Sequence, residues 1–279
     1  MLLISTGFDF MDSITILVLG LVQGIAEWVP ISSKTQVSLT WLKGFNGDPA
    51  SLVPILLYVH IGTLLAATIY FRKEIAEILR SVLAKPLAKA TYTEGKTGFL
   101  ITSIFLTGVI GFPLLYLEKK FFPTIDTGVL FALMGAGLIL TGLLLLSQKG
   151  SAERKKDSAG WKDGILTGVM QGLSVLPGVS RSGTSTTALI WRGFSSEDSF
   201  YLSFLLSIPT VVCAEMVFYI GGVTASFPIF DGIMLAASSF VFGYLTLDAL
   251  LKLMRKVNVS YAALLMGVVM VAAWFFGAG

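Results

Sequence analysis

The sequence predicts an all-α integral membrane protein built as an inverted repeat, in which each half is a re-entrant helical hairpin followed by three transmembrane helices. The first observation is composition: 54% of the 279 residues are hydrophobic and 13% are charged, whereas soluble domains carry about 25% charged residues. The second is a polar motif that occurs twice within apolar sequence. The third is the placement of Lys and Arg, which gather in two connections. This composition excludes a soluble binding module.

The repeated motif predicts two broken helices. Its copies lie at about 12–42 and 164–191, and Pro30 and Pro177 interrupt them midway. Non-helical backbone is tolerated at membrane depth only where protein buries it or where it lines a polar cavity. Two such breaks in corresponding halves predict two half-helix tips that meet at one site. The matching positions are Gly20, Gln23, Gly24, Pro30 and Ser32 in the first copy, and Gly168, Gln171, Gly172, Pro177 and Ser180 in the second.

Six further stretches are apolar and long enough to span a bilayer, which takes roughly 20 residues. Repeat 1 covers 1–147, with its hairpin and spans at 51–71, 98–117 and 128–147. A basic loop at 148–163 leads into repeat 2, which covers 164–279, with its hairpin and spans at 199–221, 232–251 and 259–277. Three spans separate the two motif copies, and an odd number inverts the second copy. We expect one single membrane domain.

Orientation follows from the basic residues. The connections at 72–96 and 148–163 are rich in Lys and Arg, and basic loops stay in the cytoplasm. We therefore expect both connections on the cytoplasmic side of a multi-pass protein of the plasma membrane. The first hairpin then enters from outside and the second from the cytoplasm. Residues 1–12 contain no Lys or Arg, so no cleaved signal peptide is expected.

The first tip carries a carboxylate in apolar sequence. Gln23 and Glu27 are four residues apart and share a helix face with Gly20 and Gly24, which let another backbone come close. A carboxylate at membrane depth costs several kcal/mol unless it is paired, bound to a metal or facing water. Glu27 is therefore a candidate functional residue. The alternative is a protonated acid that is hydrogen-bonded to the opposite hairpin.

Hydroxyl groups follow each break. Ser32 and Ser33, followed by Lys34, stand where a hydroxyl would cap the next helix. A helix N-terminus with free N–H groups attracts anions, and Arg181 at the second tip adds a guanidinium fork suited to phosphate. For the serines alone, capping is the expected role. The arginine favours an anionic ligand, whose candidate contacts at the second tip are Gly178, Ser180, Ser182, Gly183, Thr184 and Ser185.

These motifs resemble the two signature regions of the undecaprenyl-pyrophosphate phosphatase family, the bacitracin-resistance phosphatases. The resemblance extends over nearly the whole chain, including 57–63 and 203–209. It implies hydrolysis of undecaprenyl diphosphate to the monophosphate and inorganic phosphate, aided by a divalent cation, Mg²⁺ or Ca²⁺, which recycles the lipid carrier of cell-wall sugars. By position, Gln23 and Glu27 fall on the family's acidic motif, Ser33 on a proposed nucleophile and Arg181 on the arginine that binds pyrophosphate.

One departure from the family concerns catalysis. The family has a histidine three residues after the serine, where this chain has Gln36. Serine needs an adjacent base, and glutamine cannot accept a proton at neutral pH. We therefore expect Glu27 to be the general base, acting on water or on Ser33. Since no base adjoins Ser33 in the sequence, direct attack by water is expected, with Ser33 and Gln36 as phosphate ligands. The single histidine, His60, is expected to serve packing or a hydrogen bond, and an indirect role beside the site is the alternative.

Other expectations concern the cation, the partners and the alternative functions. Glu27 and the buried Glu215 are the candidate cation ligands. The expected partners are a polyprenyl diphosphate and the bilayer, with no nucleic acid and with a homodimer left open. A polyprenyl-phosphate flippase or transporter is the alternative function, because inverted repeats with broken helices are typical of carriers. A lipid phosphatase with a histidine nucleophile is disfavoured, because His60 lies far from any arginine-serine motif.

Overall fold

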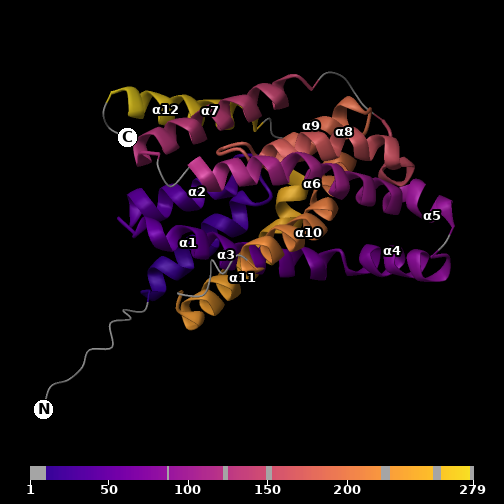
Figure 1. The fold of residues 1–279 in the computed structure, drawn as a ribbon, viewed down its shortest axis with the longest axis horizontal. Helices are drawn as coiled ribbons and strands as arrows, with labels where there is room; N and C mark the ends of the chain where they lie inside the picture. Colours follow the sequence, from indigo (N-terminus) through magenta and orange to yellow (C-terminus); the bar gives the residue numbers. More distant parts are fainter. Residues whose placement is uncertain are drawn as a thin grey trace, which may run out of the picture.

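The computed structural model describes residues 11–86, 88–121, 125–148, 153–220, 227–253 and 259–276. Within these ranges the chain is helical, apart from turns and one isolated bridge between Arg154 and Phe194 (Figure 1). The helices are α1 (Ser13–Ala26), α2 (Ser33–Leu39), α3 (Leu52–Tyr70), α4 (Arg72–Ala84), α5 (Lys89–Thr93), α6 (Gly95–Phe121), α7 (Thr127–Leu146), α8 (Trp161–Gly172), α9 (Arg181–Trp191), α10 (Ser196–Ile220), α11 (Ile229–Leu253) and α12 (Ser260–Phe275).

Five of the described helices are long and apolar enough to cross a membrane, which makes this a multi-pass membrane protein. They correspond to five of the six stretches expected from the sequence. The last stretch holds α12, which has 16 residues and is shorter than the other five. A sixth span therefore stays a prediction. The five candidate spans are Pro49–Tyr70, Gly95–Glu118, Thr127–Leu146, Ser196–Phe218 and Ile229–Leu253.

The first helix of each motif copy, α1 or α8, packs closely on a long helix from the other half of the chain. Helix α1 lies against α11. A Cβ added at Gly20 would lie 2.1 Å from Ser238 Oγ, and one at Gly24 would lie 2.6 Å from the Gly243 backbone nitrogen. No larger side chain fits at these two positions without displacing α11. The expected close backbone approach is confirmed.

Helix α8 packs on α6 in a similar way. A Cβ at Gly164 would lie 2.6 Å from the Phe99 carbonyl oxygen, and one at Gly168 would lie 2.5 Å from the Ser103 carbonyl oxygen. Helices α7 and α12 form a separate pair along one edge of the molecule (Figure 1). The elements that carry the two motif copies are therefore held between the long helices.

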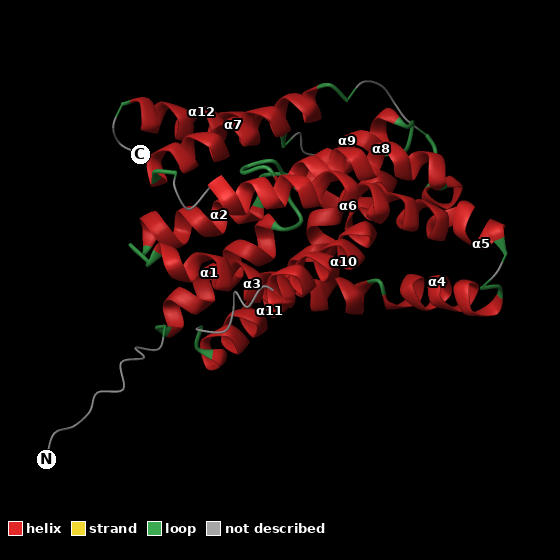
Figure 2. Cartoon of the chain, in the orientation of Figure 1, coloured by secondary structure: helices red, strands yellow, loops and turns green. Residues whose placement is uncertain are grey.

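The two helix breaks lie inside the protein. Figure 2 draws them as short loops enclosed between helices. After α1 the chain turns through Trp28, which is 1% exposed. After α8 and a 3-10 turn at Leu173–Val175, it turns through Gly178, whose φ of 77° is the left-handed region that glycine adopts most readily. A Cβ at Gly178 would lie 1.8 Å from the Met134 carbonyl oxygen, so this turn sits directly on α7.

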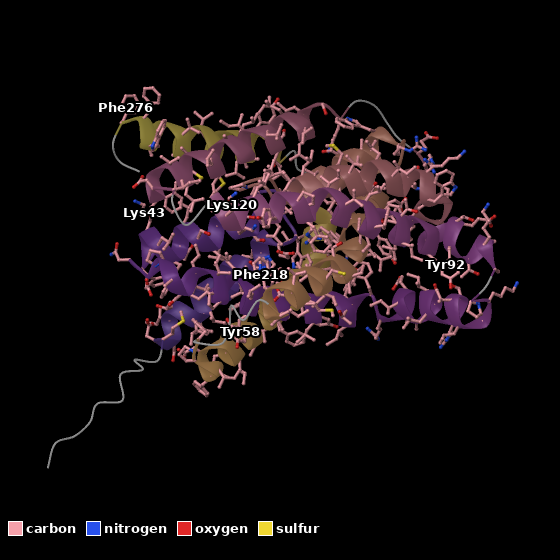
Figure 3. The ribbon with its side chains drawn as sticks, in the orientation of Figure 1. Lys43, Tyr58, Tyr92, Lys120, Phe218 and Phe276 are labelled. Carbon is pink, nitrogen blue, oxygen red and sulfur yellow. The ribbon has the colours of Figure 1, made fainter. Side chains whose placement is uncertain are left out.

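The described parts of the two basic connections contain regular structure and side-chain contacts. The 72–96 connection forms α4 and α5. In the second connection, the Asp163 carboxylate accepts hydrogen bonds from Arg154 at 2.9 and 3.0 Å and from Arg192 at 2.8 Å, which ties residues 154–163 to the end of α9. Figure 3 shows basic nitrogen atoms gathered at this end of the molecule, near Tyr92.

Candidate active site

The end of α1 presents Glu27 to the centre of the protein. Glu27 follows the last helical residue and is 6% exposed. The next residue, Trp28, donates its indole N–H to the Gly243 carbonyl at 3.1 Å, and its ring packs on Phe204 at a centroid distance of 5.3 Å. Because Pro30 has no N–H with which to continue a helix, the chain turns here. These contacts with α10 and α11 fix the direction of the carboxylate.

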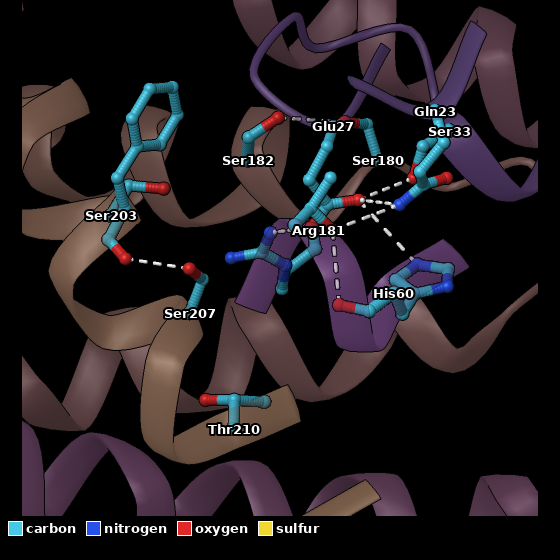
Figure 4. A network of polar contacts seen from close by, with 12 residues as sticks. Gln23, Glu27, Ser33, His60, Ser180, Arg181, Ser182, Ser203, Ser207 and Thr210 are labelled. Atoms are coloured by element: carbon cyan, nitrogen blue, oxygen red, sulfur yellow. Dashed lines mark hydrogen bonds and ion pairs between the residues drawn. The ribbon is translucent and has the colours of Figure 1, made fainter. Parts of the chain in front are cut away.

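The Glu27 carboxylate contacts side chains from both motif copies (Figure 4). Its Oε1 atom accepts a hydrogen bond from Arg181 Nη2 at 2.5 Å. Its Oε2 atom accepts from Ser33 Oγ at 2.7 Å and from Gln23 Nε2 at 3.0 Å. Glu27 and Arg181 are 154 residues apart in sequence. A buried carboxylate needs such partners, since an unpaired charge would be strongly destabilising.

Helix α3 supplies the remaining polar wall. Thr63 Oγ1 accepts from Gln23 Nε2 at 3.3 Å, and His60 Nε2 lies 3.5 Å from Glu27 Oε2. Gln23 is fully buried, and its Oε1 atom has no hydrogen-bond partner in the described part of the chain. An unsatisfied buried acceptor is destabilising by about 1–3 kcal/mol, so this oxygen is available to a ligand.

The start of α9 holds Arg181 in place. Ser180 caps the helix by accepting from the Gly183 N–H at 3.3 Å, as expected, and the Ser180 N–H donates to Thr141 Oγ1 of α7 at 3.0 Å. The Nη1 atom of Arg181 is buried and makes no hydrogen bond to the described residues. One arm of the guanidinium therefore holds Glu27, and the other is free to donate to an anion.

Sequence comparisons identify the family of this chain. A family model described as bacitracin resistance protein BacA matches residues 16–272. The chain belongs to this family. An undecaprenyl-diphosphatase of Methanococcoides burtonii is 37% identical over 264 residues, 93% of this chain and 97% of the relative. Another with that name, from Methanothrix thermoacetophila, is 35% identical over 94% of this chain and 97% of the relative. A third, from Saccharolobus islandicus, is 40% identical over 73% of each chain.

In this BacA family member, several of the residues that we expect to bind phosphate do not contact the Glu27 carboxylate. Lys34 pairs with Glu118 of α6 at 3.8 Å, and the Gln36 amide donates to the Ile31 carbonyl at 3.0 Å. Ser32 stands at the start of α2 but makes no capping hydrogen bond, so its expected capping role is wrong. Its φ of 60° is left-handed, unlike the extended backbone of an ordinary cap, and its Oγ accepts from Thr35 instead.

The hydroxyls that follow Arg181 are buried and mostly bonded within the protein. Ser182 Oγ lies 3.2 Å from Ser180 Oγ. Thr184 and Ser185 donate to the Arg181 carbonyl at 3.0 and 2.8 Å, so they brace the first turn of α9. Gly183 faces Thr141, where a Cβ would lie 2.7 Å from Cγ2. These contacts fix the first turn of α9, on which Arg181 stands.

The structure adds two contacts that are not evident from the sequence. No base adjoins Ser33 along the chain, but the turn after α1 brings Glu27 Oε2 within 2.7 Å of the Ser33 hydroxyl. His60 makes the expected hydrogen bond, from Nδ1 to the Leu56 carbonyl at 2.6 Å, and its Nε2 atom also lies 3.5 Å from the Glu27 carboxylate. The sequence contains a signal for this position of His60: it stands three residues before Thr63 on a mostly apolar helix, so both polar side chains share one face.

Proposed function

We propose that this chain is an undecaprenyl-diphosphatase, which hydrolyses a long-chain polyprenyl diphosphate to the monophosphate and inorganic phosphate. The observation that carries the proposal is the Glu27 carboxylate, which joins Ser33 Oγ at 2.7 Å to Arg181 at 2.5 Å. This arrangement pairs a hydroxyl nucleophile with a base and with a phosphate-binding cation. The hydrolysis recycles a lipid carrier for cell-wall or glycan synthesis, and it accounts for bacitracin resistance.

The first chemical step uses Ser33 and Glu27. Ser33 Oγ attacks the terminal phosphorus, and its proton passes to Glu27 Oε2. The bond from that phosphorus to the bridging oxygen breaks, and the oxygen leaves with the electron pair on the polyprenyl monophosphate. In the second step, water attacks the phosphoserine and the bond from phosphorus to Ser33 Oγ breaks. Oγ takes back the proton held by Glu27, which restores the Ser33 hydroxyl and releases inorganic phosphate. The hydrogen bond between Ser33 and Glu27 supports this route over direct attack by water.

Arg181 stabilises the charge on the transferring phosphoryl group. Its Nη1 atom is buried and unpaired among the described residues, so a phosphoryl oxygen can take this position without displacing Glu27 from Nη2. Donors that are already oriented toward developing charge act strongly in a site that excludes water. Ser180 and Thr141 fix the backbone at the start of α9, so the guanidinium is held before substrate arrives. Ser182 and Gly178 stay predicted contacts of the phosphate.

A divalent cation fits this site only together with the substrate. Among the described residues there is no group of three His, Cys, Asp or Glu side chains that could hold a metal. Mg²⁺ is commonly bound by one or two protein carboxylates and by substrate phosphates. Gln23 Oε1, buried and unpaired in the described chain, would hold Mg²⁺ or Ca²⁺ together with Glu27, and Glu215 on α10 stays a further predicted ligand. The cation would neutralise charge on the diphosphate oxygens.

We also propose that the two motif copies form an inverted repeat, with the basic connections in the cytoplasm of a plasma-membrane protein. Two matching contacts support this. Gln23 Nε2 donates to Thr63 of α3 at 3.3 Å, and Gln171 Nε2 donates to Thr210 of α10 at 2.9 Å. The Oε1 atoms of both glutamines are buried and unpaired among the described residues. The packing of α8 on α6 also corresponds to the packing of α1 on α11: each motif helix contacts a long helix of the other half.

A flippase for the polyprenyl phosphate is the second candidate, and these paired helix breaks favour it. One difference between the copies favours the phosphatase. The residue four positions after Gln23 is Glu27, whereas the residue four positions after Gln171 is Val175. The base and the phosphate-binding arginine thus form a single, asymmetric site. A carrier needs no nucleophile, so the pairing of Ser33 with Glu27 is better explained by hydrolysis.

The test is phosphate release from undecaprenyl diphosphate by the purified protein, with and without EDTA. The proposal predicts release of one phosphate per lipid, and EDTA should abolish release until Mg²⁺ or Ca²⁺ is restored. A preparation that releases no phosphate but moves polyprenyl monophosphate across vesicle membranes would contradict the phosphatase and support the flippase.

A further inference from the structure

His60 is the only histidine of the chain, and two contacts fix its ring. Its Nδ1 atom lies 2.6 Å from the Leu56 carbonyl oxygen, one turn earlier on α3. Because a carbonyl can only accept, Nδ1 must carry the hydrogen and donate it. The other nitrogen, Nε2, is then directed at Glu27 Oε2, 3.5 Å away. The side chain is 20% exposed, so the ring lies at the wall of the site rather than in bulk solvent.

The oxygen that His60 faces is the one that contacts the nucleophile. Oε2 of Glu27 accepts from Ser33 Oγ, while Oε1 is held by Arg181. Arg181 on one oxygen and His60 beside the other therefore fix the rotation of the carboxylate about its last bond.

We propose that His60 is a positioning residue of the phosphatase site, which acts through Glu27 and keeps Oε2 aimed at the Ser33 hydroxyl. This inference rests on the function proposed above. Gln36 cannot take this role, because its amide donates to the Ile31 carbonyl at 3.0 Å. Neighbouring Thr63 engages Gln23 instead of the carboxylate. Helix α3 thus contributes the one imidazole in the chain to the end of α1.

Two substitutions separate positioning from packing. His60→Leu fills a similar volume but cannot bond to Oε2, whereas His60→Gln can place an amide N–H near the position of Nε2. We expect His60→Leu to lower kcat by up to about a hundredfold, with KM nearly unchanged, and His60→Gln to recover a large part of kcat. The matched control is Thr68→Val, also on α3, because the Thr68 hydroxyl bonds, among the described residues, only to the Leu64 carbonyl of its own helix.

The single histidine also allows a measurement that needs no activity. In protein labelled with ¹⁵N-histidine, only His60 gives imidazole signals. We expect a hydrogen on Nδ1, and we expect the Nε2 resonance to shift in Glu27→Gln but not in Thr68→Val. A His60→Leu variant with turnover within twofold of wild type would overturn the proposal. So would a loss of kcat in His60→Gln equal to that in His60→Leu, or an Nε2 resonance that does not shift in Glu27→Gln.

The outcomes also separate this inference from the function on which it rests. If wild-type protein releases no phosphate, the phosphatase itself is contradicted, and the Nε2 resonance then decides whether the contact with Glu27 exists. If wild type is active and His60→Leu is equally active, only the role of His60 is contradicted. Should His60→Leu fail to fold, the His60→Gln kinetics and the Nε2 resonance decide.

Discussion

Glu27 Oε2 lies 2.7 Å from Ser33 Oγ, although a helix break separates the two residues. The other oxygen of the same carboxylate holds Arg181 from the second motif copy. The carboxylate thus connects the proposed nucleophile to the proposed phosphate-binding cation. Residues that act as such a unit have strongly non-additive effects when they are replaced. Combining Glu27 and Ser33 substitutions should therefore lower activity little beyond the larger single effect.

Glu27→Gln should remove most of the phosphatase activity. The amide keeps the shape of the side chain but cannot take the proton of Ser33, and general-base catalysis contributes about a hundred- to ten-thousand-fold. The measurement is kcat for phosphate release from undecaprenyl diphosphate. Gln36→Ala should be much milder, since this amide contacts the Ile31 carbonyl rather than the carboxylate. Equal losses in the two variants would argue against Glu27 as the base.

Arg181→Lys should lower kcat by roughly a hundredfold or more. Lysine keeps the positive charge but loses the planar fork that contacts Glu27 through one arm and phosphate through the other. Removing one oriented donor from the charge developing in a transition state typically costs about 10²–10³ in kcat. Steady-state kinetics on the lipid substrate will measure the loss. A lysine variant with wild-type kcat would show that the fork is dispensable.

Gly168→Val should destabilise the protein. The first added carbon would lie 2.5 Å from the Ser103 carbonyl oxygen, and overpacking of this kind costs about 1–3 kcal/mol. Thermal unfolding in detergent should show a lower Tm. The matched control is Gly44→Val, where an added Cβ would meet no atom within 4 Å. An unchanged Tm in Gly168→Val would contradict the close packing of α8 on α6.

Cysteine labelling tests the proposed orientation. In a Cys213→Ser background, cysteines that replace Lys85 and Lys155 should react only with reagents that reach the cytoplasm, because basic connections stay inside. A cysteine that replaces Thr127, the first residue of α7, should react from outside. External labelling at position 85 or 155 would overturn the inverted-repeat proposal.

Local sequence determined much of the fold but little of the contact geometry. The breaks at Pro30 and Pro177 follow from residues that cannot continue a helix, and apolar stretches predict the five long spans. The helical character of α4 was missed because its basic residues were interpreted only as a topology signal. The contact between Glu27 and Arg181 spans 154 residues, and no periodicity encodes such a distance. The short turn after α1, which brings Glu27 to Ser33, is likewise set by the burial of Trp28 between α10 and α11.

The central claim is that Ser33 attacks the diphosphate with Glu27 as its base. The most direct measurement is mass spectrometry of protein that has been quenched in acid during turnover of undecaprenyl diphosphate. The account predicts a phosphate on Ser33 in wild type, little of it in Glu27→Gln, and near-complete loss of turnover in Ser33→Ala. Full turnover without a phosphorylated Ser33, together with a modest loss in Ser33→Ala, would contradict it and would assign the attack to water.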